Sequence, residues 1–261
     1  MIAEILGDKK LIKSFRRSLK RLLYTGLEFF RFDVRKALKL YSEYFLSLLS
    51  YVRAEGSLKT INKMELYPCL FDKIAYTPVE PIYFFQNSWA AKHIFNLKPK
   101  YIVDIGSPIT FLGIISQFVK VFFVDIRPPT IKVRGLEYIK GDIKSLPFKD
   151  NSIDFLSSLC VVEHIGLGRY GDEIDPYGTE KALSDMKRVV KKGGILIFSF
   201  HVDSEDKIYF NAHRAFDIDY IGKKIEGFEI KDQKYLYGER IYDRYMKEMG
   251  FGTAFLCLKK L

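Results

Sequence analysis

The sequence has little cysteine and lacks both a signal peptide and a long apolar run. The three cysteines among 261 residues, Cys69, Cys160 and Cys257, lie far apart and form no CxxC spacing. This pattern favours neither a disulfide framework nor a zinc site, and a reducing, cytoplasmic location suits it best. The longest apolar stretch, which begins at Tyr44, is too short to cross a bilayer. A charged stretch follows MIAEIL, where a signal peptide would have an apolar run and a cleavage site.

Acidic residues are scarce near the N-terminus. Residues 8–40 contain eleven lysines and arginines against three acidic residues, so most of the net charge of +10 lies in this segment. Apolar residues recur there at helical spacing, which predicts amphipathic helices over residues 8–54 with a break near Gly26 or Asp33. Such a basic helix packs on a domain, lies on an anionic membrane or contacts nucleic-acid phosphates. We expect this segment either to pack on the rest of the protein or to contact the inner face of the membrane peripherally. We regard nucleic-acid binding as the weaker alternative.

Proline and glycine punctuate residues 55–80, which indicates a linker. We therefore predict a basic helical extension with its linker over residues 1–80 and a second domain over residues 81–261. Hydrophobic residues make up 48% of the chain, which is enough for a buried core.

Apolar runs alternate with helical segments from Tyr101 to Phe200, which predicts parallel βαβ units in a doubly wound α/β sheet. Two further apolar segments, Phe228–Lys231 and Thr253–Leu258, are predicted to close the sheet as an antiparallel pair. We expect a charged, aromatic helix between them.

Acidic residues end or directly follow three of these runs, at Asp104, Asp125 and Asp142. The carboxyl ends of parallel strands line the ligand crevice of an open α/β sheet, so these carboxylates indicate a nucleoside-bearing cofactor. Gly106 and Ser107 follow the first strand, where a tight turn brings the backbone close to a ligand. Asp125 lies 21 residues after Asp104, at the distance typical of an acidic residue that binds ribose hydroxyls.

A nicotinamide cofactor would use the same crevice. Pro108 and Thr110 stand where its glycine fingerprint would need glycine. A third acidic strand end, at Asp142, is better explained as an acceptor for an adenine amino group.

The order VDIGS, VDIRP, GDIKSLPFKDNSIDFLSS and MKRVVKKGGILIFS, within Tyr83 to Phe228, resembles the class I S-adenosylmethionine-dependent methyltransferases. SLCVVEHIGLGRYGD and FNAHR more specifically resemble an uncharacterised methyltransferase-like family that is often associated with bacterial surface-glycan synthesis. The resemblance implies S-adenosylmethionine as cofactor and a Rossmann-like, seven-stranded sheet whose last strand is antiparallel. The cofactor-binding residues that it implies are Asp104, Gly106, Ser107, Asp125, Ile126, Asp142, Ile143, Leu159 and Cys160.

Glu163 and His164 follow the fourth strand, at the mouth of the predicted crevice. Histidine accepts protons near neutral pH, so we predict His164 as a base, together with Glu163 and with His213 from FNAHR. His201 also follows a strand but has fewer polar neighbours in the sequence.

A long polar and aromatic loop follows His164 and is a candidate acceptor site or lid. The predicted substrate-binding residues are Arg169, Tyr170, Asp172, Asn211 and Arg214. Asp172 and Asp175 lack a clear third ligand, so we expect no metal there. An NPPY-type motif, expected for amide or base N-methylation, is absent, which favours an oxygen acceptor.

The favoured function is O-methylation of a small molecule, or of a sugar in a glycan or glycolipid precursor. Two alternatives remain: a cofactor-degenerate interaction subunit of a glycan-assembly system, and an RNA methyltransferase that uses the basic N-terminal arm. The sequence leaves the oligomeric state open.

Overall fold

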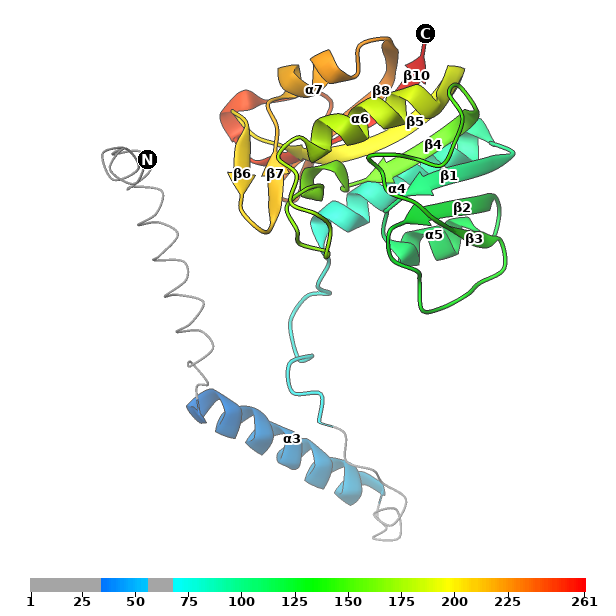
Figure 1. Ribbon diagram of the computed structural model, residues 1–261. Helices are drawn as coiled ribbons and strands as arrows, with labels where there is room; N and C mark the ends of the chain where they lie inside the picture. The colour runs from blue at the N-terminus through cyan, green and yellow to red at the C-terminus, as the bar shows by residue number, and fades with distance from the viewer. Residues whose placement is uncertain (1–33, 56–67) are drawn as a thin grey trace. The chain divides into compact units, whose positions relative to one another are not determined.

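The computed structural model describes residues 34–55 and 68–261, and the chain divides into two units, Met1–Pro78 and Val79–Leu261 (Figure 1). In the first unit, α3 (Val34–Glu55) is a helix of 22 residues. The helix predicted over residues 8–33 lies outside the described residues. Within the described ranges, no helix is long and apolar enough to cross a membrane.

One mixed sheet organises the second unit, with the strand order β3-β2-β1-β4-β5-β10-β8-β9. Strands β1 to β5 run parallel, and β10 runs antiparallel to both β5 and β8. The parallel strands are β1 (Tyr101–Ile105), β2 (Lys120–Asp125), β3 (Leu136–Lys140), β4 (Ile153–Leu159) and β5 (Val190–Val202). The antiparallel part comprises β8 (Phe228–Tyr237), β9 (Arg240–Tyr242) and β10 (Gly252–Lys260). The predicted doubly wound sheet with an antiparallel last strand is therefore confirmed.

Helices cover both faces of the sheet (Figure 1). One buried core contains side chains of α6 (Gly178–Val189) and α7 (Ile218–Lys224), and the other contains those of α4 (Pro81–Leu97) and α5 (Ile109–Ile115). Strand residues alternate between the two cores: Val103 belongs to the first and Ile102 to the second. This alternation follows from the two-residue period of a strand and gives three layers.

The region after β5 differs from the prediction. A hairpin of β6 (Lys207–Tyr209) and β7 (His213–Ala215) follows β5, and the sheet has eight strands rather than seven because β9 is added. The prediction of a charged helix between the last two strands is wrong. Strand β8 continues to Tyr237, the chain turns at Gly238, and β9 pairs with β8 in the antiparallel direction. Tyr235 to Tyr237 are buried, so packing against the core overrides the helical pattern of this charged segment.

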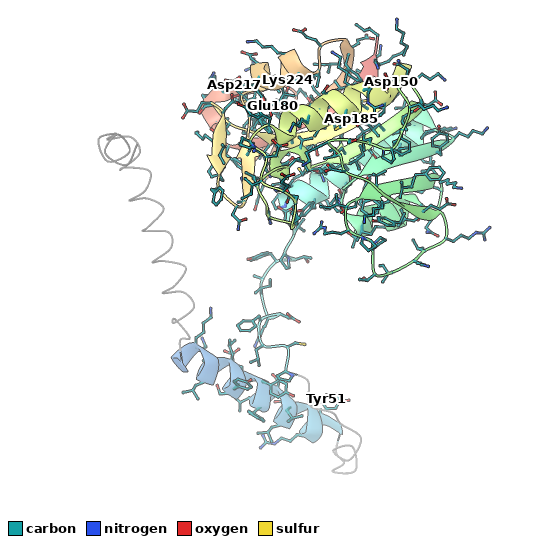
Figure 2. The ribbon with its side chains drawn as sticks, viewed as in Figure 1. Tyr51, Asp150, Glu180, Asp185, Asp217 and Lys224 are labelled. Atoms are coloured by element: carbon teal, nitrogen blue, oxygen red, sulfur yellow. The ribbon has the colours of Figure 1, made fainter. Side chains whose placement is uncertain are left out.

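Ion pairs fix the loop after β3 against α6. Arg188 donates to Asp185 at 2.7 Å and to Asp150 at 2.8 Å, and Asp185 accepts from the Leu146 N–H at 2.5 Å. Figure 2 labels Asp150 and Asp185, which lie on the side of the sheet that α6 covers. Because this loop also contains Asp142, the network positions one of the predicted cofactor ligands.

Candidate functional site

A cavity of about 750 Å³ lies at the carboxyl ends of β1, β2, β3 and β4. Eight of the nine predicted cofactor-binding residues line it, and Asp104 does not. The eight are Gly106, Ser107, Asp125, Ile126, Asp142, Ile143, Leu159 and Cys160. The fold thus gathers four strand ends, separated by helices or loops in the sequence, around one space.

Asp104 lies behind the first turn and is fully buried. Its carboxylate accepts from the Ser107 N–H at 3.1 Å, from Ser107 Oγ at 2.7 Å and from Ser157 Oγ at 2.5 Å. Burial raises the pKa of Asp104 to about 6, and these hydrogen bonds oppose that rise. Ser107 Oγ in turn accepts from the Leu159 N–H at 3.0 Å. Asp104 therefore holds β1, the turn and β4 together. The sequence predicts it as a cofactor-binding residue, and in the structure its oxygens bind other parts of the protein.

Replacing Asp104 by alanine should lower the free energy of unfolding by about 3 kcal/mol. The change leaves two buried hydroxyls and an amide without their acceptor, and each such loss costs about 1–3 kcal/mol. Chemical denaturation measures the effect. Asp154→Ala is the control, because Asp154 is exposed and pairs only with Lys191 at the surface. Equal stability of the two variants would contradict the structural role of Asp104.

Gly106 gives the turn its backbone geometry. Its φ is +66°, and a Cβ at this position would lie 3.0 Å from Val161 Cγ1. An L side chain would therefore be both strained and crowded here. The glycine keeps the backbone bare where it lines the cavity.

The other two strand-end carboxylates are oriented by nearby backbone N–H groups. Asp125 Oδ1 accepts from the Arg127 N–H at 2.8 Å, and Asp142 Oδ1 accepts from the Lys144 N–H at 2.8 Å. The Asp125 side chain is 14% exposed, whereas that of Asp142 is 45% exposed. Both carboxylates can thus accept hydrogen bonds from a ligand in the cavity.

His164 lies in the short helix η2 (Val162–His164) and lines the cavity. Its Nδ1 is 2.7 Å from the carbonyl oxygen of Ala212, a distance that assigns the ring proton to Nδ1. Nε2 then carries the lone pair. Burial lowers the pKa of His164 to about 4, and the charge of Arg169 acts in the same direction. The ring is therefore neutral at pH 7, and the same burial makes it a weaker base than free imidazole.

Glu163 and His213, the other predicted catalytic residues, do not line the cavity. Glu163 is fully buried, and burial raises its pKa to about 8, a rise that the nearby Cys160 thiol and the backbone N–H of Glu163 oppose. Among the described residues, neither oxygen has a well-placed hydrogen bond. The His213 ring centroid is 6.3 Å from that of His164, and burial lowers the pKa of His213. The structure thus brings these residues next to His164 but leaves His164 as the one that faces the ligand space.

Of the predicted substrate-binding residues, Tyr170 and Asp172 line the cavity. Asp172 accepts from the backbone N–H groups of Gly166 and Tyr170, so it also shapes the loop. Arg169 Nη1 donates to the Ala212 carbonyl at 2.8 Å, outside the cavity lining.

Asn211 and Arg214, on the β6–β7 hairpin, do not line the cavity either. Asn211 has a φ of +63° at an exposed turn. Arg214 is buried and donates to the carbonyl of Ile165 and to Thr179 Oγ1, so its guanidinium connects the hairpin to η2 and α6.

Three buried polar residues near the site were missed: Gln86, Ser199 and His201. Gln86 Oε1 accepts from Ser199 Oγ at 2.7 Å and from Cys160 Sγ at 2.9 Å. His201 lies 3.7 Å from Glu163 and 3.1 Å from Thr253 Oγ1. The fold thus gives His201 polar neighbours that come from distant parts of the sequence. The position of His201 near the end of an apolar strand was the sequence feature that could have marked it as a site residue.

Parts of the chain are similar to known proteins. Residues 143–238 match the model of a family described as Caenorhabditis protein of unknown function, DUF268. An uncharacterized protein of Methanocaldococcus jannaschii is 25% identical over 172 residues, which cover 65% of this chain and 71% of that protein. A protein of Encephalitozoon cuniculi named "Putative methyltransferase" is 28% identical over 126 residues, or 46% of this chain and 56% of that protein.

Among solved structures, a SAM-dependent methyltransferase of Thermotoga maritima is similar with a TM-score of 0.46 and 22% identity. The match covers 68% of this chain and 93% of that one. The sheet identifies the fold through its strand order: β1 to β5 run parallel, and β10 runs antiparallel between β5 and β8. This chain has the fold of the class I S-adenosylmethionine-dependent methyltransferases.

Proposed function

We propose that this protein transfers a methyl group from S-adenosylmethionine to a hydroxyl group of a sugar in a glycan or glycolipid precursor. The observation that carries the proposal is the single cavity that eight predicted cofactor-binding residues line. Its volume of about 750 Å³ lies within the usual range for cofactor and small-molecule sites.

The residues of the cavity fit the cofactor. The bare backbone at Gly106 would accommodate its methionine part, and the Asp125 carboxylate would accept hydrogen bonds from the ribose. Asp142 would accept from the adenine amino group, with Ile126 and Ile143 as apolar surface for the ring. When bound, S-adenosylmethionine supplies an electrophilic methyl group.

His164 is the residue that would remove the hydroxyl proton of the acceptor. Its Nδ1 proton is used on the Ala212 carbonyl, which leaves the Nε2 lone pair available. The neutral ring would accept the proton at Nε2 as the oxygen gains its methyl group. The residues that line the cavity would align the acceptor with the methyl group.

The mouth of the cavity suits a sugar. Tyr170, Asp172 and Glu173 line it, and the Arg127 guanidinium lies 4.5 Å from the centre of the Tyr170 ring. An aromatic face packs on the apolar side of a sugar ring, and carboxylates accept from its hydroxyls.

Calorimetry and a transfer assay test the proposal. We expect binding of S-adenosylmethionine, followed by incorporation of labelled methyl groups into a fractionated extract of saccharides and glycolipids. Binding without incorporation into any saccharide fraction would contradict the acceptor class. A folded protein that fails to bind S-adenosylmethionine at millimolar concentration would instead support the non-catalytic interaction subunit.

A second part of the proposal concerns residues 8–54, which would hold the protein at an anionic membrane surface. In the described part of this segment, α3 exposes Leu38, Phe45 and Leu49. Their spacing places them on one face of the helix. An apolar face on a basic segment is typical of helices that lie in a membrane interface.

Replacing Leu38 and Phe45 together by glutamate should reduce binding to vesicles that contain phosphatidylserine by about tenfold or more. The change removes two apolar anchors and adds two negative charges near the lipid surface. Vesicle flotation measures the bound fraction. Ser47→Glu is the control, because Ser47 lies on the opposite face of α3. An equal loss for the control would show that charge alone, rather than this face, governs binding.

A further inference from the structure

A buried cluster of three potential metal ligands lies beside the cavity. One ligand atom each from Cys160, Glu163 and His201 lies within 4.8 Å of the others. Cys160 directly follows β4, Glu163 belongs to η2, and His201 comes from the neighbouring strand β5. Within residues 34–55 and 68–261, this is the one group of three such side chains that could share an ion.

Glu163 is the member of this cluster whose oxygens lack a well-placed hydrogen bond among the described residues. The residue is fully buried, and the donors next to its oxygens are the Cys160 thiol and the backbone N–H of Glu163 itself. The nearest cationic candidate, His201 Nε2, is 3.7 Å from Oε1, which is too long for a hydrogen bond. Buried acidic side chains normally have well-placed hydrogen-bond partners, and a cation bound here would give the Glu163 oxygens such a partner.

The ligand atoms indicate which cation fits. A thiolate, an imidazole and a carboxylate form a mixed set that suits Zn²⁺, whereas Mg²⁺ and Ca²⁺ prefer oxygen alone. Three protein ligands are also the usual number in zinc sites that keep one position open. Cys160 lines the cavity, so an ion here would border the space for the acceptor.

Neighbouring groups already orient two of the ligands. Thr253 Oγ1 lies 3.1 Å from His201 Nδ1 and can accept its proton, which would direct the lone pair of Nε2 toward Glu163. Cys160 is held at a φ of +53°, and its backbone N–H donates to the carbonyl oxygen and to Oγ of Ser199, both at 3.0 Å. A non-glycine residue in this conformation is strained, and such strain is typical of functional positions.

We propose that Cys160, Glu163 and His201 bind one Zn²⁺ ion. Binding would release the thiol proton of Cys160 and the carboxyl proton of Glu163 to solvent and leave a metal-bound thiolate and carboxylate. This site goes beyond the proposed function, because methyl transfer from a sulfonium does not itself require a metal.

Titration with Co²⁺, a spectroscopic substitute for Zn²⁺, tests the site in the full-length, tag-free protein after treatment with a chelator. We expect one equivalent of Co²⁺ to give a thiolate-to-metal charge-transfer absorption that Zn²⁺ abolishes. Cys160→Ser should remove this absorption. Cys69→Ser, at an exposed cysteine, should keep it.

Glu163→Gln and His201→Gln provide a second measurement and should weaken Zn²⁺ binding by at least about 100-fold in competition with a chelating dye. Thermal melting checks that each variant folds. The proposal is overturned if the wild-type protein gives no thiolate absorption, or if the absorption persists in Cys160→Ser. S-adenosylmethionine calorimetry on the same sample separates the two proposals: cofactor binding without metal binding overturns only the zinc site.

Discussion

Asp125→Ala should weaken the binding of S-adenosylmethionine by about 100-fold. Hydrogen bonds to a charged acceptor contribute about 1.5–3 kcal/mol each, and loss of about 2.7 kcal/mol corresponds to that factor. Asp125 ends β2 at the cavity, its side chain is only 14% exposed, and the Arg127 N–H fixes its orientation. The carboxylate therefore needs little further ordering when the ribose binds. Isothermal titration calorimetry measures the change.

Two further variants make this test specific. Asp125→Asn keeps the shape and one acceptor oxygen, so it should lose less affinity than alanine. Asp154→Ala removes an exposed carboxylate that pairs with Lys191, and it should bind the cofactor as the wild type does. Unchanged affinity in Asp125→Ala would show that the ribose does not lie at the end of β2.

The parts of the site that the sequence predicts well depend on local patterns. Strands β1 and β2 are short, mostly apolar runs with an acidic residue at or near the end, so these strand ends could be placed before their packing was known. Parallel pairing then brings these ends together without further information. Asp125 and Asp142 reach the cavity for this reason.

The same pattern cannot distinguish a carboxylate that faces the cavity from one that faces the protein. Asp104 follows the rule for strand ends, but its oxygens are used by Ser107 and Ser157. Ser157 lies 53 residues away in the sequence, on the next strand of the sheet. Only the pairing of β1 with β4 shows that these groups meet.

The histidines show the largest gap between sequence and structure. His164 and His201 are 37 residues apart, and the fold brings both close to the His213 ring, at centroid distances of 6.3 and 4.6 Å. Pairing of β4 with β5 places Cys160 and Glu163 near His201. A search for closely spaced ligands, such as CxxC, could not find this group because Glu163 stands in place of a second cysteine and His201 comes from another strand.

His164→Ala should lower the rate of methyl transfer by about 100-fold or more and leave the affinity for S-adenosylmethionine nearly unchanged. A positioned general base contributes about 10²–10⁴-fold to a rate. His164 is the predicted catalytic residue that lines the cavity, and the Ala212 carbonyl at 2.7 Å fixes the tautomer that leaves Nε2 unprotonated. The rate is measured as incorporation of labelled methyl groups into the active saccharide fraction.

Chemical rescue separates a base from a structural residue. Added imidazole should partly restore the rate of His164→Ala, because the lost side chain leaves a space beside the cavity that a free base can enter. His213→Ala is the matched control: its ring neighbours that of His164 but does not line the cavity, so this variant should retain most of the rate. Full activity in His164→Ala would exclude this residue as the base. A loss that imidazole does not restore, with a similar loss in His213→Ala, would assign to both rings a role in holding η2 and the β6–β7 hairpin together.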